Sequence, residues 1–171
     1  MKLYHVLKTN LMLLLLLVIF CAELHAAPVG KVTGYPIPRF VSLGSNEINL
    51  RRGPGTKFPI AWVYQRKGFP VEVIDEWVNW RHIKDRDGVS GWVHMSLLSG
   101  KRTAVITVDQ TSLFTQPRPE SRIKARINRD VITSIETCEL TFCSVRVDGF
   151  SGWISKTDFY GAYPSEQFAD D

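Results

Sequence analysis

A nearly identical heptapeptide occurs twice in the chain, as DGVSGWV at residues 87–93 and as DGFSGWI at residues 148–154. Each copy has an Asp-Gly dipeptide, a second glycine, and a tryptophan followed by a β-branched residue. The repeat extends further back, where INLRRGPG (48–55) matches TSLFTQPRP (111–119) at one leucine and one proline. A repeat of this kind predicts two units with a common plan, each of about 55–60 residues.

Both units consist of short segments rich in valine, isoleucine, tryptophan and tyrosine, separated by turn residues. The clearest are IAWVY (60–64), FPVEVIDEW (69–77), NWRHI (79–83) and GWVHM (91–95). No segment keeps a helical period, and a single helical turn is expected only near residues 96–98. Many short strands at close spacing favour a sandwich or a barrel. We therefore predict an all-β fold with two tandem small barrels of about five strands each.

In this scheme the heptapeptide closes each barrel. The Asp-Gly dipeptide is expected to form a hairpin turn, and the second glycine to let the last long strand bend. Trp92 and Trp153 are expected to fill the barrel interiors as structural core residues.

The N-terminus has the pattern of a secretory signal peptide. Lys2 and Lys8 precede an apolar run over residues 11–21, which small residues follow. The run is too short for a free-standing membrane span. We expect cleavage after Ala26, because cleavage after Ala27 would leave Pro28 at the new N-terminus. An uncleaved membrane anchor is the alternative, and with cleavage no integral span remains.

The predicted order along the chain starts with a signal peptide at residues 1–26 and an extended N-terminal segment at 27–44. A first barrel follows at 45–99, a linker at 100–104, a second barrel at 105–161, and a C-terminal tail at 162–171. Signal cleavage removes two lysines and one glutamate, which lowers the formal net charge from +4 to +3. The predicted location is the periplasm or the exterior. This mild charge does not indicate nucleic-acid binding.

Cys138 and Cys143 bracket only four residues. In an exported protein such a pair predicts a disulfide, which would stabilise the second unit by about 2 kcal/mol on the loop-entropy argument. A redox pair would have two intervening residues, and a zinc site would need two further ligands. Glu76 and Arg81 occupy the equivalent sites of the first unit, where an exposed ion pair would contribute less than about 1 kcal/mol.

The segments NLRRGPG, PVEVI, NWRHI, DGVSGWV and SLLSG, in that order, resemble the bacterial SH3-like (SH3b) domain. More narrowly, the chain is similar to exported proteins with two such copies, in which the second copy carries a C-x4-C hairpin and the chain ends near a GxYP segment, here residues 161–164. The resemblance covers residues 38–166. It implies a β-barrel binding module, and relatives are thought to attach proteins to peptidoglycan or to recognise short peptides. The second copy lacks counterparts of Arg51 and Gly53.

Catalysis needs a nucleophile, a base or a metal in a defined arrangement. Both mature cysteines are expected to be bonded, and His82 and His94 are expected to be structural. We therefore predict no catalytic residue, metal or cofactor, with a cell-wall hydrolase as the less favoured alternative.

Binding is better supported, because a barrel of this size cannot bury all the aromatic side chains of the first unit. Trp62 and Tyr64 are two residues apart and should share one face of a strand. The predicted ligand-binding residues are Arg51, Trp62, Tyr64, Trp77 and Trp80. The basic string at 118–129 is interpreted as a solvated loop and a strand with outward charges. The expected partner is cell-wall peptide or glycan, or an envelope protein for which the chain acts as an adaptor.

Overall fold

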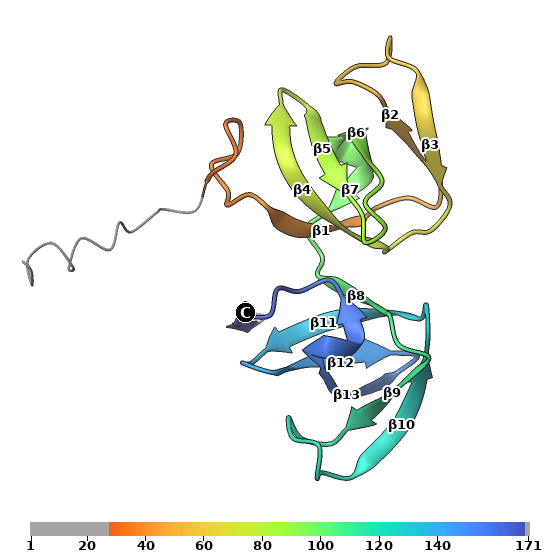
Figure 1. The fold of residues 1–171 in the computed structure, drawn as a ribbon, viewed down its shortest axis with the longest axis vertical. Coiled ribbons are helices and arrows are strands. Elements are labelled where there is room, and N and C mark those ends of the chain that lie inside the picture. Colours follow the sequence, from red (N-terminus) through yellow and green to blue (C-terminus); the bar gives the residue numbers. More distant parts are fainter. Residues whose placement is uncertain (1–27, 170–171) are drawn as a thin grey trace, which may run out of the picture.

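The computed structural model describes residues 28–169, so the predicted signal peptide lies outside the described residues. These residues form two small β-barrels, drawn one above the other in Figure 1. The strands of the first barrel are β1 (Arg39–Leu43), β2 (Ile48–Arg51), β3 (Ile60–Tyr64), β4 (Pro70–Trp77), β5 (Trp80–Lys84), β6 (Ser90–His94) and β7 (Leu98–Ser99). Those of the second are β8 (Thr103–Ile106), β9 (Gln110–Phe114), β10 (Ile123–Asn128), β11 (Ile132–Cys138), β12 (Phe142–Val147), β13 (Phe150–Ser155), β14 (Phe159–Tyr160) and β15 (Phe168–Ala169).

The two sheets have the same topology. The first has the order β3-β2-β6-β5-β4-β1-β7, and the second has the order β10-β9-β13-β12-β11-β8-β14, with β15 added beside β11. The all-β fold of two tandem repeats is therefore confirmed, with seven equivalent strands in each sheet instead of the expected five. One turn of 3-10 helix follows the last long strand of each repeat, η1 (Met95–Leu97) and η2 (Lys156–Asp158). Among residues 28–169, no helix is long and apolar enough to cross a membrane.

The strand limits differ in two places from the domain limits that the sequence predicts. β1 lies inside the expected N-terminal segment, yet it pairs with both β4 and β7. β8 begins at Thr103, inside the expected linker, and pairs with β11. Residues 100–102 are thus the segment between the two sheets.

The expectation that Trp92 and Trp153 fill the barrels is wrong. Both are only partly buried, whereas their neighbours Val93 and Ile154 are fully buried in the two cores. Side chains alternate between the faces of a strand, so a tryptophan next to an inward residue points outward. Gly91 is two residues before Val93 and therefore lies on the same inner face. At this position β2 passes so close that an added Cβ would lie 2.7 Å from Leu50 Cγ.

The Asp-Gly dipeptide forms the expected tight hairpin only in the second repeat. Asp148 and Gly149 both have positive φ, 47° and 82°, and join the paired residues Val147 and Phe150. This is the two-residue turn that Asp-Gly favours. In the first repeat, Lys84 pairs with Ser90, so residues 85–89 make a longer loop.

An apolar contact joins the two barrels. Val105 is fully buried within the core of the first barrel, and Ile132 and Tyr160 of the second barrel pack against the same core. The Phe40 ring lies 4.9 Å from the Tyr160 ring. An ion pair of 2.7 Å between Arg86 and Asp130 also crosses the contact.

The ion pair expected at Glu76 is formed, but it is buried instead of exposed. Neither Glu76 nor Arg81 is more than 5% exposed, and the N-terminal segment over residues 30–35 covers the carboxylate. Glu76 accepts hydrogen bonds from Thr33 Oγ1 at 2.7 Å, from Thr33 N at 2.9 Å and from Arg39 Nη2 at 2.7 Å. Arg81 Nε lies 3.6 Å from Glu76 Oε1.

Cys138 and Cys143 form the predicted disulfide at the position that corresponds to Glu76 and Arg81. In both repeats the two residues are a directly opposed cross-strand pair. In the second barrel, the C-terminal strand β15 pairs with β11, and Phe168 lies opposite Cys138. The N-terminal segment in one barrel and the C-terminal segment in the other thus pack against corresponding positions.

Candidate binding face on the first barrel

The outer face of the first sheet carries two rows of aromatic side chains. In the first row Trp77 on β4 pairs with Trp80 on β5, and Trp80 pairs with His94 on β6. Directly opposed residues of antiparallel strands project to the same side, so these three rings are neighbours on one face. The Trp80 and His94 rings meet edge to face, with centroids 5.5 Å apart.

The second row lies one step along the same strands. His82 on β5 pairs with Trp92 on β6, and Trp92 pairs with Arg51 on β2. The His82 and Trp92 rings stack at 4.9 Å with an angle of 10° between their planes. Because His82 is two residues from Trp80, both rows share the outer face.

We call the side chains of Trp77, Trp80, His82, Trp92 and His94 the aromatic face. Trp77 is 61% exposed, and the other four are partly exposed. Of these five residues, only Trp77 and Trp80 were among the predicted binding residues. The histidines could have been added from the spacing, since both WRHI and WVH place a histidine two residues after a tryptophan. Such flat, partly exposed rings can stack on sugars and on peptide groups.

His82 provides a pH probe of this face. Burial lowers the pKa of His82 below its usual 6.5, although the nearby Asp75 carboxylate opposes the shift. In the unfolded chain His82 takes up its proton at a higher pH than in the folded chain, so stability falls as the pH drops through 6.5. Unfolding by urea between pH 7.5 and pH 5 should show this decline, and the decline should be smaller in a His82→Gln variant. An NMR titration that gives His82 a pKa above 6.5 would contradict this prediction.

Two of the predicted binding residues have structural contacts. Arg51 Nη1 donates hydrogen bonds to the carbonyl oxygens of Thr56 and Phe58, at 3.1 and 2.8 Å, which holds the loop between β2 and β3. Tyr64 is buried, and its hydroxyl donates to Asp85 Oδ2 at 2.9 Å. Burial and the Asp85 carboxylate both raise the pKa of Tyr64. Tyr64 is therefore not accessible to a ligand, and its prediction as a binding residue is wrong.

Trp62 lies on the same strand as Tyr64 but is 53% exposed. The two residues pair with Leu50 and Ile48, which point inward, so they share a face as expected. Tyr64 lies over the core, whereas Trp62 extends beyond it on the edge strand. Trp62 is therefore separate from the aromatic face.

The second barrel has a smaller version of the aromatic face. Trp153 pairs with Ser144 and Phe114, where the first barrel has His82 and Arg51. The Phe114 and Phe142 rings meet edge to face at 6.1 Å, and Phe142 is buried. The larger aromatic face is thus specific to the first repeat.

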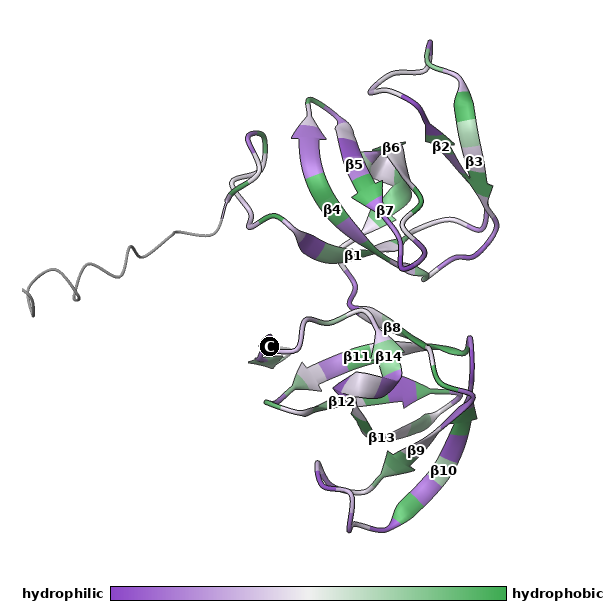
Figure 2. Cartoon of the chain, in the orientation of Figure 1, coloured by the Kyte–Doolittle hydropathy of each residue, from purple (hydrophilic) through white to green (hydrophobic). Residues whose placement is uncertain are grey.

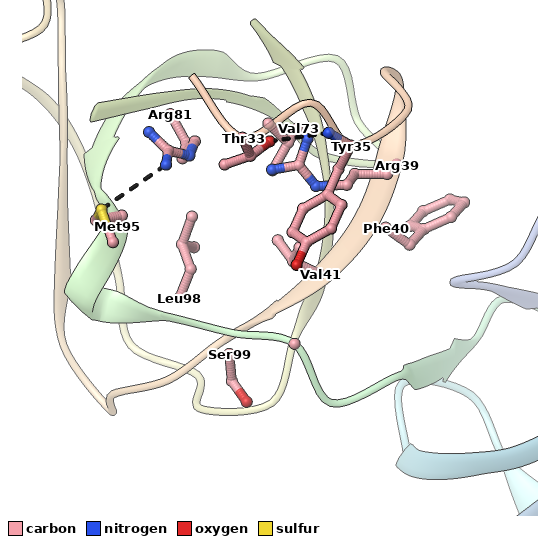
Figure 3. A pocket seen from close by; sticks show the side chains of 11 residues that line it. Thr33, Tyr35, Arg39, Phe40, Val41, Val73, Arg81, Met95, Leu98 and Ser99 are labelled. Carbon is pink, nitrogen blue, oxygen red and sulfur yellow. Dashed lines mark hydrogen bonds between the residues drawn. The ribbon is translucent and has the colours of Figure 1, made fainter. Parts of the chain in front are cut away.

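A cavity of about 400 Å³ lies on another side of the first barrel, between the N-terminal segment and the strands. Figure 3 shows the side chains that line it. Tyr35, Arg39, Val41, Arg81 and Met95 line it. Both guanidinium groups already contact Glu76, and none of the five predicted binding residues lines this cavity. Among residues 28–169, no group of three or more histidine, cysteine or acidic side chains is placed to hold a metal ion.

The bacterial SH3 domain family matches the chain twice, at residues 44–100 and 107–161. The protein therefore belongs to the bacterial SH3 domain family, with two copies of the domain. Domains of this family are cell-wall binding modules. No curated protein matches the chain.

Two solved structures align over the chain, NlpC2 and NlpC1 from Trichomonas vaginalis, each with 12% sequence identity and a TM-score of 0.34. The alignments cover 77% and 78% of this chain, but only 51% and 49% of those proteins. The chain thus spans about half the length of either protein, and a likeness at this level carries no information on activity.

Proposed function

We propose that the protein is an exported, non-catalytic binding module of the cell envelope, which recognises peptidoglycan or short peptides through the aromatic face of the first barrel. The observation that carries the proposal is the continuous set of five partly exposed rings on β4, β5 and β6. The signal-peptide pattern supports a location in the periplasm or outside the cell. The family to which both repeats belong supports the cell wall as the target.

The two rows give this face a shape suited to an extended ligand. Trp77 and Trp80 flank the two-residue turn of the β4–β5 hairpin, and Trp92 lies further along the sheet on β6. A sugar chain or peptide lying across the strands would contact each ring in turn. Residues of this type dominate binding energy where they become covered, and single truncations can cost 2 kcal/mol or more, about 30-fold in affinity.

The test is retention on purified sacculi at physiological salt. The unmodified protein should sediment with the sacculi, and a Trp77→Ala/Trp80→Ala variant should bind at least about tenfold more weakly. Both side chains are on the outer face, so the variant should remain folded, which cooperative urea unfolding checks. Phe150→Ala is the matched control, because Phe150 is an aromatic residue of 59% exposure at a hairpin of the second barrel.

Lack of retention of the unmodified protein would exclude wall binding. An equal loss of affinity in Phe150→Ala and in Trp77→Ala/Trp80→Ala would exclude the aromatic face as the binding site. Incubation with labelled peptidoglycan tests the non-catalytic part of the proposal. Release of soluble fragments that stops in a His82→Ala or His94→Ala variant would instead establish a hydrolase.

A further inference from the structure

The first sheet has an exposed edge at β3. This strand is the terminal one in its sheet, and its neighbour is β2. The terminal strand at the same position of the second sheet is β10. An edge strand leaves a row of backbone N–H and C=O groups available to another strand.

The two edges differ in their side chains. On β3, Ile60 is 48% exposed, Trp62 53% and Val63 40%, and Ala61 between them is also exposed. Figure 2 shows β3 in green along most of its length, whereas β10 alternates between purple and green. Lys124 and Arg126 are exposed on β10. Charged residues, above all lysine, are the usual means by which proteins prevent strand addition at an edge.

Basic side chains surround the apolar centre of β3 at both ends. Arg52 and Lys57 precede the strand, and Arg66 and Lys67 follow it, all exposed. Arg52 is held near the start of the strand, where its N–H donates to the Pro59 carbonyl at 3.0 Å. Two acids are near the end of β3: the exposed Glu47, which precedes the residue paired with Tyr64, and the buried Asp85, which accepts the hydrogen bond of the Tyr64 hydroxyl.

Asp130 of the second barrel is also near, since Arg66 donates to its backbone carbonyl. The carboxylate of Asp130, however, is engaged by Arg86 at 2.7 Å. Among exposed side chains, basic residues therefore outnumber acidic ones at both ends of the strand.

These charges indicate which kind of strand can be added to β3. A second copy of the chain that added its own β3 in the antiparallel direction would bring basic residues against basic residues at both ends. A strand with acidic ends would form ion pairs there instead, and its apolar centre would cover Ile60, Trp62 and Val63. We propose that β3 binds an extended segment of a partner protein by strand addition, and that this segment is apolar in its centre and acidic at both ends.

This surface is distinct from the aromatic face, so the proposal does not depend on wall binding. Backbone hydrogen bonds along β3 would supply affinity independent of sequence, and the terminal ion pairs would supply specificity. Binding should therefore weaken with salt, as expected for exposed charges.

The test is an NMR titration of the isotope-labelled protein with the peptide Asp-Glu-Val-Thr-Val-Thr-Val-Glu-Asp. The amide resonances of residues 60–64 should shift, and replacing the four acids by lysine should weaken binding at least about tenfold. Two further peptides are N-methylated at the central valine and at the threonine before it, because successive N–H groups of a strand point to opposite edges. One of the two should bind at least about tenfold more weakly, because it lacks a backbone donor to β3.

Val63→Lys should weaken binding of the acidic peptide by a similar factor, and Ile60→Lys is a second variant with the same expected result. Ile123→Lys on β10 is the matched control, since Ile123 is 43% exposed on the equivalent edge, and it should bind normally. Val63→Lys should also keep its retention on sacculi, and Trp77→Ala/Trp80→Ala should keep its peptide binding.

Equal affinity for the acidic and lysine peptides would overturn the charge-based choice of partner. Undiminished affinity of both N-methylated peptides would overturn strand addition. Sedimentation that shows a dimer dissociated by Val63→Lys would identify a second copy as the occupant and overturn the proposal.

Discussion

Replacing Glu76 by alanine is expected to destabilise the protein by about 3–5 kcal/mol, the usual loss when one partner of a buried ion pair is removed. The carboxylate is covered by the N-terminal segment and accepts hydrogen bonds from Thr33 and Arg39. Without it, Arg81 would keep a charge at a site that is 5% exposed. Urea unfolding measures the loss.

Glu136→Ala is the control for that variant. Glu136 also pairs with an arginine, Arg146, but the Arg146 side chain is 64% exposed. Removal of this surface pair should cost less than about 1 kcal/mol. Equal losses in the two variants would show that the Glu76 cluster contributes no more than a surface pair.

The same cluster makes stability depend on acid. Burial alone would raise the pKa of Glu76, but the hydrogen bonds from Thr33, Arg39 and Val32 outweigh it and lower the pKa from 4.5 to about 2. The stability that this ionised carboxylate provides is complete above pH 4.5 and is lost as the pH falls towards 2. The shift corresponds to about 3 kcal/mol. A Glu76→Gln variant should lack this part of the acid dependence.

Replacing Gly91 or Gly152 by alanine is expected to cost about 2–3 kcal/mol, as overpacking of a tight core does. An added Cβ at Gly91 would lie 2.8 Å from the Arg51 carbonyl oxygen, and at Gly152 it would lie 2.7 Å from the Phe114 carbonyl oxygen. Because these neighbours are backbone atoms, a strand would have to move. Tryptophan fluorescence during urea unfolding measures the effect.

Gly100→Ala is the matched control. No atom lies within 4 Å of an added Cβ there. Its stability should change by no more than about 0.5 kcal/mol. If Gly91→Ala were as mild as Gly100→Ala, the close approach of β2 could not be the reason for glycine in the repeated heptapeptide.

The period-2 patterns and the internal repeat were sufficient to predict two barrels, but not which side of the last long strand faces inward. In SGWV, Trp92 and Val93 are both apolar, so alternation alone allows either to be the core residue. The crossing of β2 over Gly91 decides the question. This contact joins residues about 40 positions apart, so nothing local in the sequence reveals it.

The same limit explains why the burial of Tyr64 and of Glu76 was not predicted. Tyr64 is withdrawn from the surface by a hydrogen bond to Asp85, 21 residues away. Glu76 is covered by Thr33, 43 residues away. By contrast, Cys138 and Cys143 are close in sequence, and their bond was correctly predicted. Trp77 and Trp80 are also close in sequence, and they flank one short turn.

The corresponding hairpins of the two repeats are fastened by different chemistry, an ion pair at Glu76 and Arg81 and a disulfide at Cys138 and Cys143. A thiol reductant acts on the second fastening and leaves the first intact, whereas acid discharges the first and leaves the second intact. A reductant and acid therefore act on different hairpins of the duplicated molecule, without any change in its sequence. The duplication repeats the architecture of the barrel while giving each copy a different vulnerability.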